Sequence, residues 1–442
     1  MSTHAQSQFK TVIVLGASYG GGGAAQALAA GIPDGWRIVL VDRNSHANHI
    51  YVFPRYAVLG GHEHKAFIPY SNVFLLNGKP SPHIKITAHI LEFNTNSVTL
   101  SKSFPEHGIP TQTLNFEYAI YALGAHLPSP LDIWGHQKQA ILASPKFGPI
   151  RTVYAGEKAQ GIEWLKENQK MISEPSTVLI VGGGALGIQY ATDIAAVHPT
   201  KKITLLHSRD RLLPRFDEAM HVEIIRALKD SNVEVILGDR LDLASVKDEK
   251  VDASGQRVVK TTSGREIAAE LLLLCTGQSP NTDLLSKWDP STVDSKTGLA
   301  HVLPTMQLGV LPPQSLSTPS TEDNSETAQE ETTPYPHIFA IGDSADAFGA
   351  IAAGHTAYYQ GGVAARNIIK LIKARESSNP AESLEAYKPS PPAIKVSLGL
   401  TKGVYQYQGG VNVSNEGQED LQAATVWASF GIKVENDEQM RA

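Results

Sequence analysis

A pattern of strand, glycine turn, helix and strand occurs twice in this chain and constrains the fold more than any other feature. The first copy runs from the aliphatic stretch 11–15 through a glycine cluster and an alanine-rich segment to the stretch 37–41. The second copy occupies 177–206. A continuous aliphatic strand that turns through glycines into a helix is typical of a βαβ unit that binds a dinucleotide. The repeat therefore predicts two dinucleotide-binding modules on one polypeptide.

The first glycine turn predicts a site for the diphosphate of a dinucleotide. In the fingerprint, the first glycine forms the tight turn, the second admits pyrophosphate, and the third allows close packing of helix on strand. A serine stands at the second position, and its hydroxyl can itself donate to phosphate. An acid at the end of the next strand can accept hydrogen bonds from ribose hydroxyls. The residues predicted to bind the cofactor here are Gly16, Ala17, Ser18, Tyr19, Gly20, Gly21 and Asp42. The alternative is a glycine-rich loop in another kind of α/β domain.

The second glycine turn has the full fingerprint, in Gly182, Gly184 and Gly187. No acid follows its second strand, because 207–211 reads His-Ser-Arg-Asp-Arg. An acid there would bind ribose hydroxyls and repel a 2′-phosphate, whereas Ser208 and Arg209 can bind that phosphate. We therefore predict NADPH, in preference to NADH, at the second site. The alternative is that Arg209 is an ordinary solvated side chain.

Further strands end in glycine, at Gly124, Gly277 and Gly342. Asp343 follows the last of these and can bond the sugar or diphosphate side of a flavin nucleotide, while a helix expected just after it directs its positive end at the ring. Taken alone, Asp343 is equally well explained as an N-cap. Two nucleotide sites together predict a flavin and a nicotinamide, because hydride transfer needs both.

Charge and cysteine content exclude several classes of function. The formal net charge of −6 argues against a nucleic-acid partner, which requires a basic surface. Cys275 is the single cysteine, so the chain can form neither an internal disulfide nor a dithiol relay. No metal site is predicted. No apolar run reaches the ~20 residues of a membrane span, and Ser2 stands where N-myristoylation needs glycine. We expect a soluble, cytoplasmic protein; a peripheral membrane contact and a mitochondrial association stay open.

A chain of 442 residues exceeds the size at which a single core keeps growing. We expect an α/β fold with two Rossmann-like domains and a small C-terminal α+β domain. The expected boundaries are 9–150 with 276–380 for the FAD-binding domain, 151–275 for the NAD(P)H-binding domain, and 381–442 for the third. The stretch 311–335 is rich in Ser, Thr, Pro and Glu and is predicted to be a disordered loop.

Several segments together resemble the apoptosis-inducing-factor-like branch (AMID, or ferroptosis suppressor protein) of the FAD-dependent pyridine nucleotide oxidoreductases. They are GASYGG, FPRYAV, HKAFIPY, VGGGALG, FAIGDSAD and the terminal AYKPSPPAIKVSLGLTKGVYQ. The resemblance covers nearly the whole chain and implies a glutathione-reductase-like arrangement, with FAD in the first site and NADPH or NADH in the second. It also implies Arg55 near the flavin nucleotide, a main-chain contact from Ala88 to adenine, and Asp343 on the ribityl side. Lys65, the one candidate catalytic residue, is implied to lie close to the flavin. For Arg55 and Lys65 the alternative is an ordinary solvated charge.

The resemblance implies an NAD(P)H oxidoreductase that passes a hydride to flavin and then electrons to a quinone-like or other small acceptor. Two rival functions stay open, a redox-signalling flavoprotein of the apoptosis-inducing-factor kind and a flavin-dependent monooxygenase in secondary metabolism. Tyr358, Tyr359 and Gln360, on the helix after the acid at 343, either line an acceptor pocket or serve packing. The expected partners are a nicotinamide nucleotide and a small-molecule acceptor. Monomer and homodimer are both compatible with the sequence.

Overall fold

The computed structural model describes residues 9–75, 81–135, 141–143, 152–248, 250–311, 333–378, 380 and 382–441. Its contacts divide the chain into two compact units, each assembled from three stretches of the sequence. Unit 1 comprises Met1–Asn44, Tyr70–Ala125 and Ser279–Ser390, and unit 2 comprises Ser45–Pro69, His126–Gln278 and Pro391–Ala442. The short strands β10 (Ala125–His126) and β18 (Ser279–Pro280) lie where the chain passes from one unit to the other and back. The part of the chain that the structure describes contains no helix long and apolar enough to cross a membrane.

Unit 1 is built on a sheet that is parallel except at one edge. In spatial order its strands are β20 (Gln307–Leu308), β21 (Tyr335–Ala340), β9 (Tyr118–Tyr121), β1 (Lys10–Leu15), β2 (Trp36–Asp42) and β5 (Ile84–Thr87). Only the pairing of β20 with β21 is antiparallel in this sheet. The aliphatic side chains of β1 have no exposed surface, as expected for a parallel strand covered on both faces.

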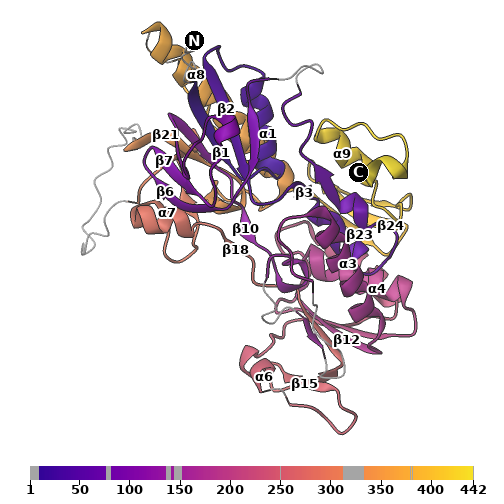
Figure 1. Cartoon of the computed structure of the whole chain (residues 1–442). Coiled ribbons are helices and arrows are strands. Elements are labelled where there is room, and N and C mark those ends of the chain that lie inside the picture. Colours follow the sequence, from indigo (N-terminus) through magenta and orange to yellow (C-terminus); the bar gives the residue numbers. More distant parts are fainter. Residues whose placement is uncertain are drawn as a thin grey trace, which may run out of the picture. The chain divides into compact units, whose positions relative to one another are not determined.

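Two helices of unit 1, α1 (Tyr19–Ala29) and α8 (Gly354–Ser377), pack closely against each other beside this sheet (Figure 1). Glycines on both helices make the approach possible. A Cβ on Gly361 would lie 2.7 Å from the backbone oxygen of Gly20, and a Cβ on Gly20 would lie 3.1 Å from the backbone oxygen of Ala357. The remaining elements are β6 (Ile90–Asn94), β7 (Ser97–Leu100), β8 (Thr113–Asn115), α7 (Asp283–Trp288), β19 (Ala300–His301) and β22 (Ala345–Asp346).

Unit 2 repeats the same plan on a second sheet. In spatial order its strands are β11 (Ile141–Ala143), β17 (Leu271–Leu274), β12 (Thr177–Val181), β13 (Lys202–Leu206) and β14 (Glu234–Ile236). The pairings are parallel apart from that of β11 with β17. The helices are α2 (Phe53–Tyr56), α3 (Lys158–Ser173), α4 (Ala185–Val197), α5 (Glu218–Asp230), α6 (Leu243–Lys247) and α9 (Ala423–Ser429).

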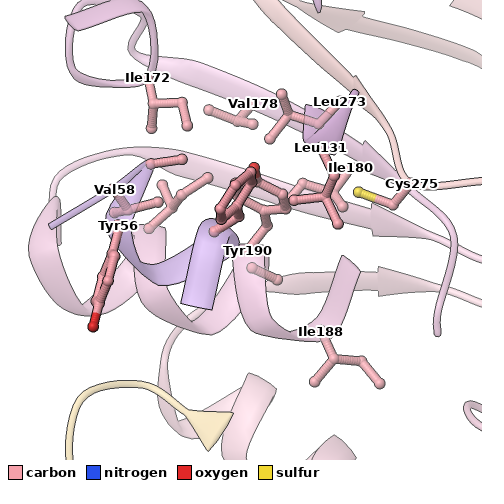
Figure 2. Packing of buried hydrophobic residues seen from close by; sticks show 14 of the residues in the cluster. Tyr56, Val58, Leu131, Ile172, Val178, Ile180, Ile188, Tyr190, Leu273 and Cys275 are labelled. Carbon is pink, nitrogen blue, oxygen red and sulfur yellow. The ribbon is translucent and has the colours of Figure 1, made fainter. Parts of the chain in front are cut away.

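The described residues of unit 2 form two hydrophobic clusters, and the larger of them packs around α4. The ring of Tyr190 lies among Leu131, Val178 and Ile180 (Figure 2), and its hydroxyl donates to the carbonyl of Pro130 at 3.2 Å. Complete burial raises the pKa of the Tyr190 hydroxyl far above its usual range, so the phenol is neutral and acts as a donor.

The division into units differs from the predicted domain boundaries. The segment 45–69 belongs to unit 2, where Phe53 and Phe67 pack in one core with Trp164 of α3. The C-terminal segment from residue 391 on is grouped with unit 2, because Val396 packs in that same core. These placements depend on contacts between distant stretches of sequence, which local patterns do not reveal.

Smaller sheets complete unit 2. They are formed by β3 (His46–Asn48) with β4 (Phe67–Pro69), by β15 (Arg257–Lys260) with β16 (Glu266–Ala269), and by β23 (Ile394–Leu398), β24 (Lys402–Tyr407) and β25 (Gly410–Ser414). The last of these is antiparallel throughout. Of the loop predicted at 311–335, residues 312–332 lie outside the described residues, and β21 begins at Tyr335.

Candidate functional site

The first glycine turn of unit 1 has the shape of a phosphate cradle. Gly16 has φ of +92°, and a Cβ on it would lie 2.4 Å from the backbone oxygen of Ala122. A Cβ on Gly21 would lie 1.8 Å from the backbone oxygen of Gly16. The helix α1 begins at Tyr19, and the side chain of Ser18 at its N-cap makes no capping hydrogen bond. The positive end of α1 and the narrow turn therefore fit a diphosphate.

Asp42 is held rigidly at the end of β2. Its Oδ2 accepts the N–H of Ala17 at 2.7 Å, and its Oδ1 accepts the backbone and side-chain N–H groups of Asn44 at 2.7 and 2.9 Å. The side chain is buried. The N–H of Ala88 donates to the carbonyl of Asp42 at 3.0 Å, so a contact from Ala88 to adenine would come from its carbonyl oxygen.

Further predicted residues lie at the same edge of the unit 1 sheet. Gly124 follows the carboxyl end of β9, the strand next to β1. Gly342 follows the carboxyl end of β21, one strand further along the sheet, and both glycines have positive φ. Asp343 follows directly and is partly buried. The helix expected at once after Asp343 begins later, at Gly354, because a 3-10 turn and β22 intervene. The open edge at the carboxyl ends of parallel strands is where α/β sheets bind ligands.

The three residues considered for an acceptor pocket, Tyr358, Tyr359 and Gln360, differ in burial. Gln360 is buried, and its Oε1 accepts the N–H of Gly342 at 2.7 Å, so it positions the turn before Asp343. Tyr358 and Tyr359 are exposed on α8, and the ring of Tyr358 covers the backbone of α1 at Gly23.

The second glycine turn, in unit 2, repeats the geometry of the first. Gly182 has φ of +118°, and a Cβ on Gly187 would lie 1.9 Å from the backbone oxygen of Gly182. Gly184 is the N-cap of α4, and a Cβ on it would meet nothing within 4 Å. The space before this helix end is therefore open to a ligand. Gly277, with φ of +95°, follows the neighbouring strand β17.

The backbone hydrogen bonds of the two turns correspond one to one. Gly16 donates to the carbonyl at 41 at 2.7 Å, and Gly182 donates to the carbonyl at 206 at 2.8 Å. In unit 1 the next N–H, that of Ala17, is donated to Asp42 Oδ2 at 2.7 Å. In unit 2 the next N–H, that of Gly183, is donated to His207 Nδ1 at 3.1 Å. His207 therefore occupies the structural place of the acid. It was not among the predicted site residues, although its position directly after the second strand matches that of Asp42.

His207 joins the glycine turn to the segment predicted to bind a 2′-phosphate. Its Nε2 lies 3.2 Å from the carbonyl of Arg211. Since Nδ1 accepts a hydrogen bond, the ring proton resides on Nε2 and is donated to that carbonyl. Burial lowers the pKa of His207, and the nearby charge of Arg209 lowers it further, so the ring is neutral. Ser208 is partly buried and Arg209 is exposed.

Arg55 is held by protein groups within unit 2, whereas the first glycine turn lies in unit 1. Its guanidinium contacts both carboxylate oxygens of Asp193 at 2.9 Å, and neither side chain has exposed surface. It also donates to the carbonyls of Gly399 at 2.6 Å and Glu419 at 3.2 Å. The role of Arg55 beside a flavin nucleotide stays a prediction, and the observed partners indicate a structural one.

Lys65 lies in an ion-pair cluster that holds the C-terminal segment of unit 2. Its Nζ contacts Asp420 at 3.0 Å and Asp437 at 3.1 Å, and His64 contacts the same Asp437 oxygen at 3.1 Å. The indole of Trp427 donates to the Lys65 carbonyl at 2.9 Å. Burial opposes the charged form of Lys65, but hydrogen bonds to the two carboxylates outweigh it and raise the pKa of Lys65. A catalytic role for Lys65 stays a prediction.

The sequence over residues 10–302 matches the pyridine nucleotide-disulphide oxidoreductase family. The chain belongs to this family. Membership places it among the NAD(P)H-dependent flavoprotein oxidoreductases, a family that uses FAD and a nicotinamide nucleotide. The glycine turns of both units have the geometry that such cofactors require.

Similar proteins span nearly the full length of the chain. Fe-regulated protein 8 of Mycosarcoma maydis is 40% identical over 438 residues, covering 97% of each chain. Ferroptosis suppressor protein 1 of Homo sapiens is 25% identical and covers 95% of each chain. Apoptosis-inducing factor homolog B of Dictyostelium discoideum is 25% identical and covers 90% of each. The resemblance to this branch is thereby confirmed.

Solved structures share the fold. Reduced Bacillus anthracis CoADR-RHD superposes with a TM-score of 0.59 at 18% identity and covers 90% of this chain. An NAD-dependent persulfide reductase from A. fulgidus gives a TM-score of 0.58 at 17% identity and covers 89%. This chain spans only 61% and 63% of the lengths of those two proteins. At such identities the likeness supports the α/β fold and carries no statement about substrate.

Proposed function

We propose that this protein is a reductase that oxidises NADPH at unit 2, holds FAD at unit 1, and delivers the electrons to a small acceptor of the quinone class. The observation that carries the proposal is the pair of glycine cradles, one in each unit, with different residues at the ribose end. Unit 1 presents the buried carboxylate of Asp42, and unit 2 presents His207 followed by Ser208 and Arg209.

The residues of the chain bind and orient, and no side chain is needed as a nucleophile. When bound, the nicotinamide supplies a hydride that the flavin accepts. The turn of unit 1 would hold the diphosphate of FAD at the positive end of α1, and Asp42 would accept hydrogen bonds from the adenosine ribose. The turn of unit 2 would hold the diphosphate of NADPH at the N-terminus of α4. Arg209 and Ser208 would bind its 2′-phosphate.

The cysteine content excludes one route for the electrons, and the resemblance to the apoptosis-inducing-factor-like branch favours a quinone. Cys275 is its single cysteine and is buried, so electrons do not pass through a disulfide of this chain. A quinone takes up two electrons and two protons, which balance the hydride and one proton from solvent. A small planar acceptor of this kind needs no covalent relay.

An anaerobic titration tests the proposal. The purified full-length protein should be yellow, and stoichiometric NADPH should bleach the flavin absorbance, which a short-chain ubiquinone analogue should then restore. Gly21→Ala serves as the matched control, because a Cβ at that position overlaps the backbone of the turn and should leave the preparation colourless. A wild-type protein that binds no FAD would end the proposal.

Two further outcomes distinguish the rival functions. Oxygen consumption coupled to a hydroxylated product would identify a monooxygenase, and reduction that no small acceptor reverses would favour a signalling role. Stoichiometric quinone reduction supports the reductase.

A further inference from the structure

His207 makes, in unit 2, the hydrogen bond that Asp42 makes in unit 1. Each side chain stands at the end of the second strand of its module and accepts the N–H of the second residue of the glycine turn, Ala17 in one case and Gly183 in the other. The strands that carry them pair with the first strands in the same parallel register. The two residues are structural counterparts, and they differ in charge.

The difference in charge changes what the ribose end of the site can accept. The carboxylate of Asp42 has two oxygens that only accept hydrogen bonds, which suits it to bind ribose hydroxyls. The ring of His207 uses Nδ1 to accept from Gly183 and Nε2 to donate to the Arg211 carbonyl. Both nitrogens are engaged, so the ring offers no acceptor to a 2′-hydroxyl. It also presents no negative charge to a 2′-phosphate.

The same ring places a cation beside this position. By holding the Arg211 carbonyl, His207 fixes the segment that carries Ser208 and Arg209 next to the turn. The backbone of Arg209 is held by the N–H of Gly238 at 3.0 Å. Among the described residues, none forms a hydrogen bond or ion pair with the exposed guanidinium of Arg209, which leaves it available to an anion.

The carboxylates near the His207 ring, those of Asp239 and Asp210, contact other groups. Asp239 donates its N–H to the His207 carbonyl, while its own carboxylate accepts the Ser263 hydroxyl at 2.6 Å and the Arg240 N–H at 2.9 Å. The side chain of Asp210 lies toward Gly238, where an added Cβ would come within 2.6 Å of its Oδ1. No carboxylate in the described part of unit 2 takes the place that Asp42 has in unit 1.

From this arrangement we infer that His207 is the residue that selects NADPH over NADH, by filling the position of the ribose-binding acid with a neutral ring. The inference rests on the proposed function, in which unit 2 binds the nicotinamide nucleotide. It assigns His207 two effects, orienting the turn through Gly183 and leaving room for the negative charge of a 2′-phosphate.

Two substitutions separate the effect of charge from that of structure. His207→Asp keeps an acceptor for the Gly183 N–H, as Asp42 shows for its own turn, and adds a negative charge. His207→Asn keeps an acceptor and adds none. Both lose the bond to the Arg211 carbonyl, so this loss is matched between them.

The probes are 2′,5′-ADP and 5′-AMP, whose binding to the full-length protein is measured by calorimetry. We expect the wild type and His207→Asn to prefer 2′,5′-ADP. In His207→Asp, affinity for 2′,5′-ADP should fall between about tenfold and a hundredfold, from charge repulsion at partly screened sites, with little change for 5′-AMP. Equal losses for both probes in both variants would show a merely structural role and overturn the inference, as would a wild type without preference.

This test separates the inference from the proposed function. Binding of the two fragments requires no flavin and no turnover, so the preference is measurable even in a protein that NADPH fails to reduce. Conversely, a flavin that NADPH bleaches while His207→Asp leaves the preference unchanged would preserve the proposed function and refute the role of His207.

Discussion

Substitution of Asp193 by alanine should destabilise unit 2 strongly, because it leaves a buried guanidinium without its counter-ion. Arg55 and Asp193 have no exposed surface and contact each other twice at 2.9 Å. Burial raises the pKa of Asp193, and the charge of Arg55 opposes this shift. Arg55 is further bound to the carbonyls of Gly399 and Glu419, which hold it in place after the carboxylate is removed.

The expected loss is about 3–5 kcal/mol in the free energy of unfolding, the range found when one partner of a buried ion pair is deleted. Asp193→Asn, which keeps one acceptor oxygen, should lose less. The double variant Arg55→Met with Asp193→Leu should be more stable than Asp193→Ala, because it removes both charges together and fills the space with apolar groups.

Urea unfolding followed by tryptophan fluorescence measures these differences, with Trp164 and Trp427 reporting on unit 2. A loss below about 1 kcal/mol for Asp193→Ala would refute the reasoning. The same variants test the position of Arg55. If Arg55 contacts the flavin nucleotide, Arg55→Met should lower FAD occupancy while Asp193→Asn should not; if it is structural, both should lower stability at unchanged occupancy.

Three further predictions follow from local geometry. Gly184→Ala should weaken NADP+ binding about tenfold without changing Tm, since its Cβ enters open ligand space, whereas Gly187→Ala should lower both, because its Cβ meets the turn backbone. Burial opposes ionisation of Asp437, yet the bond from Lys65 lowers its pKa to about 2. The stabilisation of the folded protein by ionised Asp437 is fully present above the unfolded-state pKa of about 3.9. It is lost as the pH falls through the folded-state pKa of about 2. Because the carboxylate is half exposed, Asp437→Asn should cost about 1 kcal/mol at pH 7 and flatten the acid limb of an unfolding curve. Burial raises the pKa of Cys275, so the native protein should resist a thiol reagent at pH 8, and Cys275→Ala should keep its reductase activity; labelling of the folded protein would contradict this.

The local parts of both nucleotide sites could be predicted from the sequence. A glycine that needs positive φ, as Gly16 and Gly182 do, lies between a buried strand and a helix, and all three signals fall within a few residues. The acid at Asp42 belongs to the same short pattern. His207 occupies an equivalent position and was missed because the expected residue type was an acid, and an imidazole there has meaning only through its bonds to the turn and to the Arg211 carbonyl.

The long-range parts could not be predicted in this way. Arg55 and Asp193 are 138 residues apart, and each alone looks like a surface charge in the sequence. Lys65 likewise meets Asp420 across 355 residues. No periodicity connects such positions, so their pairing emerges only when the core of unit 2 forms. The same reason explains why the segments 45–69 and 391–442 were not assigned to unit 2.

The assembly of each unit from three stretches has a consequence for how the protein is made. During translation, helix α1 of unit 1 can be covered only after α8 has been synthesised. Unit 2 can be completed only later, after β23, β24 and β25 have been synthesised. A message truncated after codon 390 would yield a polypeptide lacking Val396, Val404 and Trp427. Such a product would expose apolar surface of unit 2 that chaperones and proteases recognise.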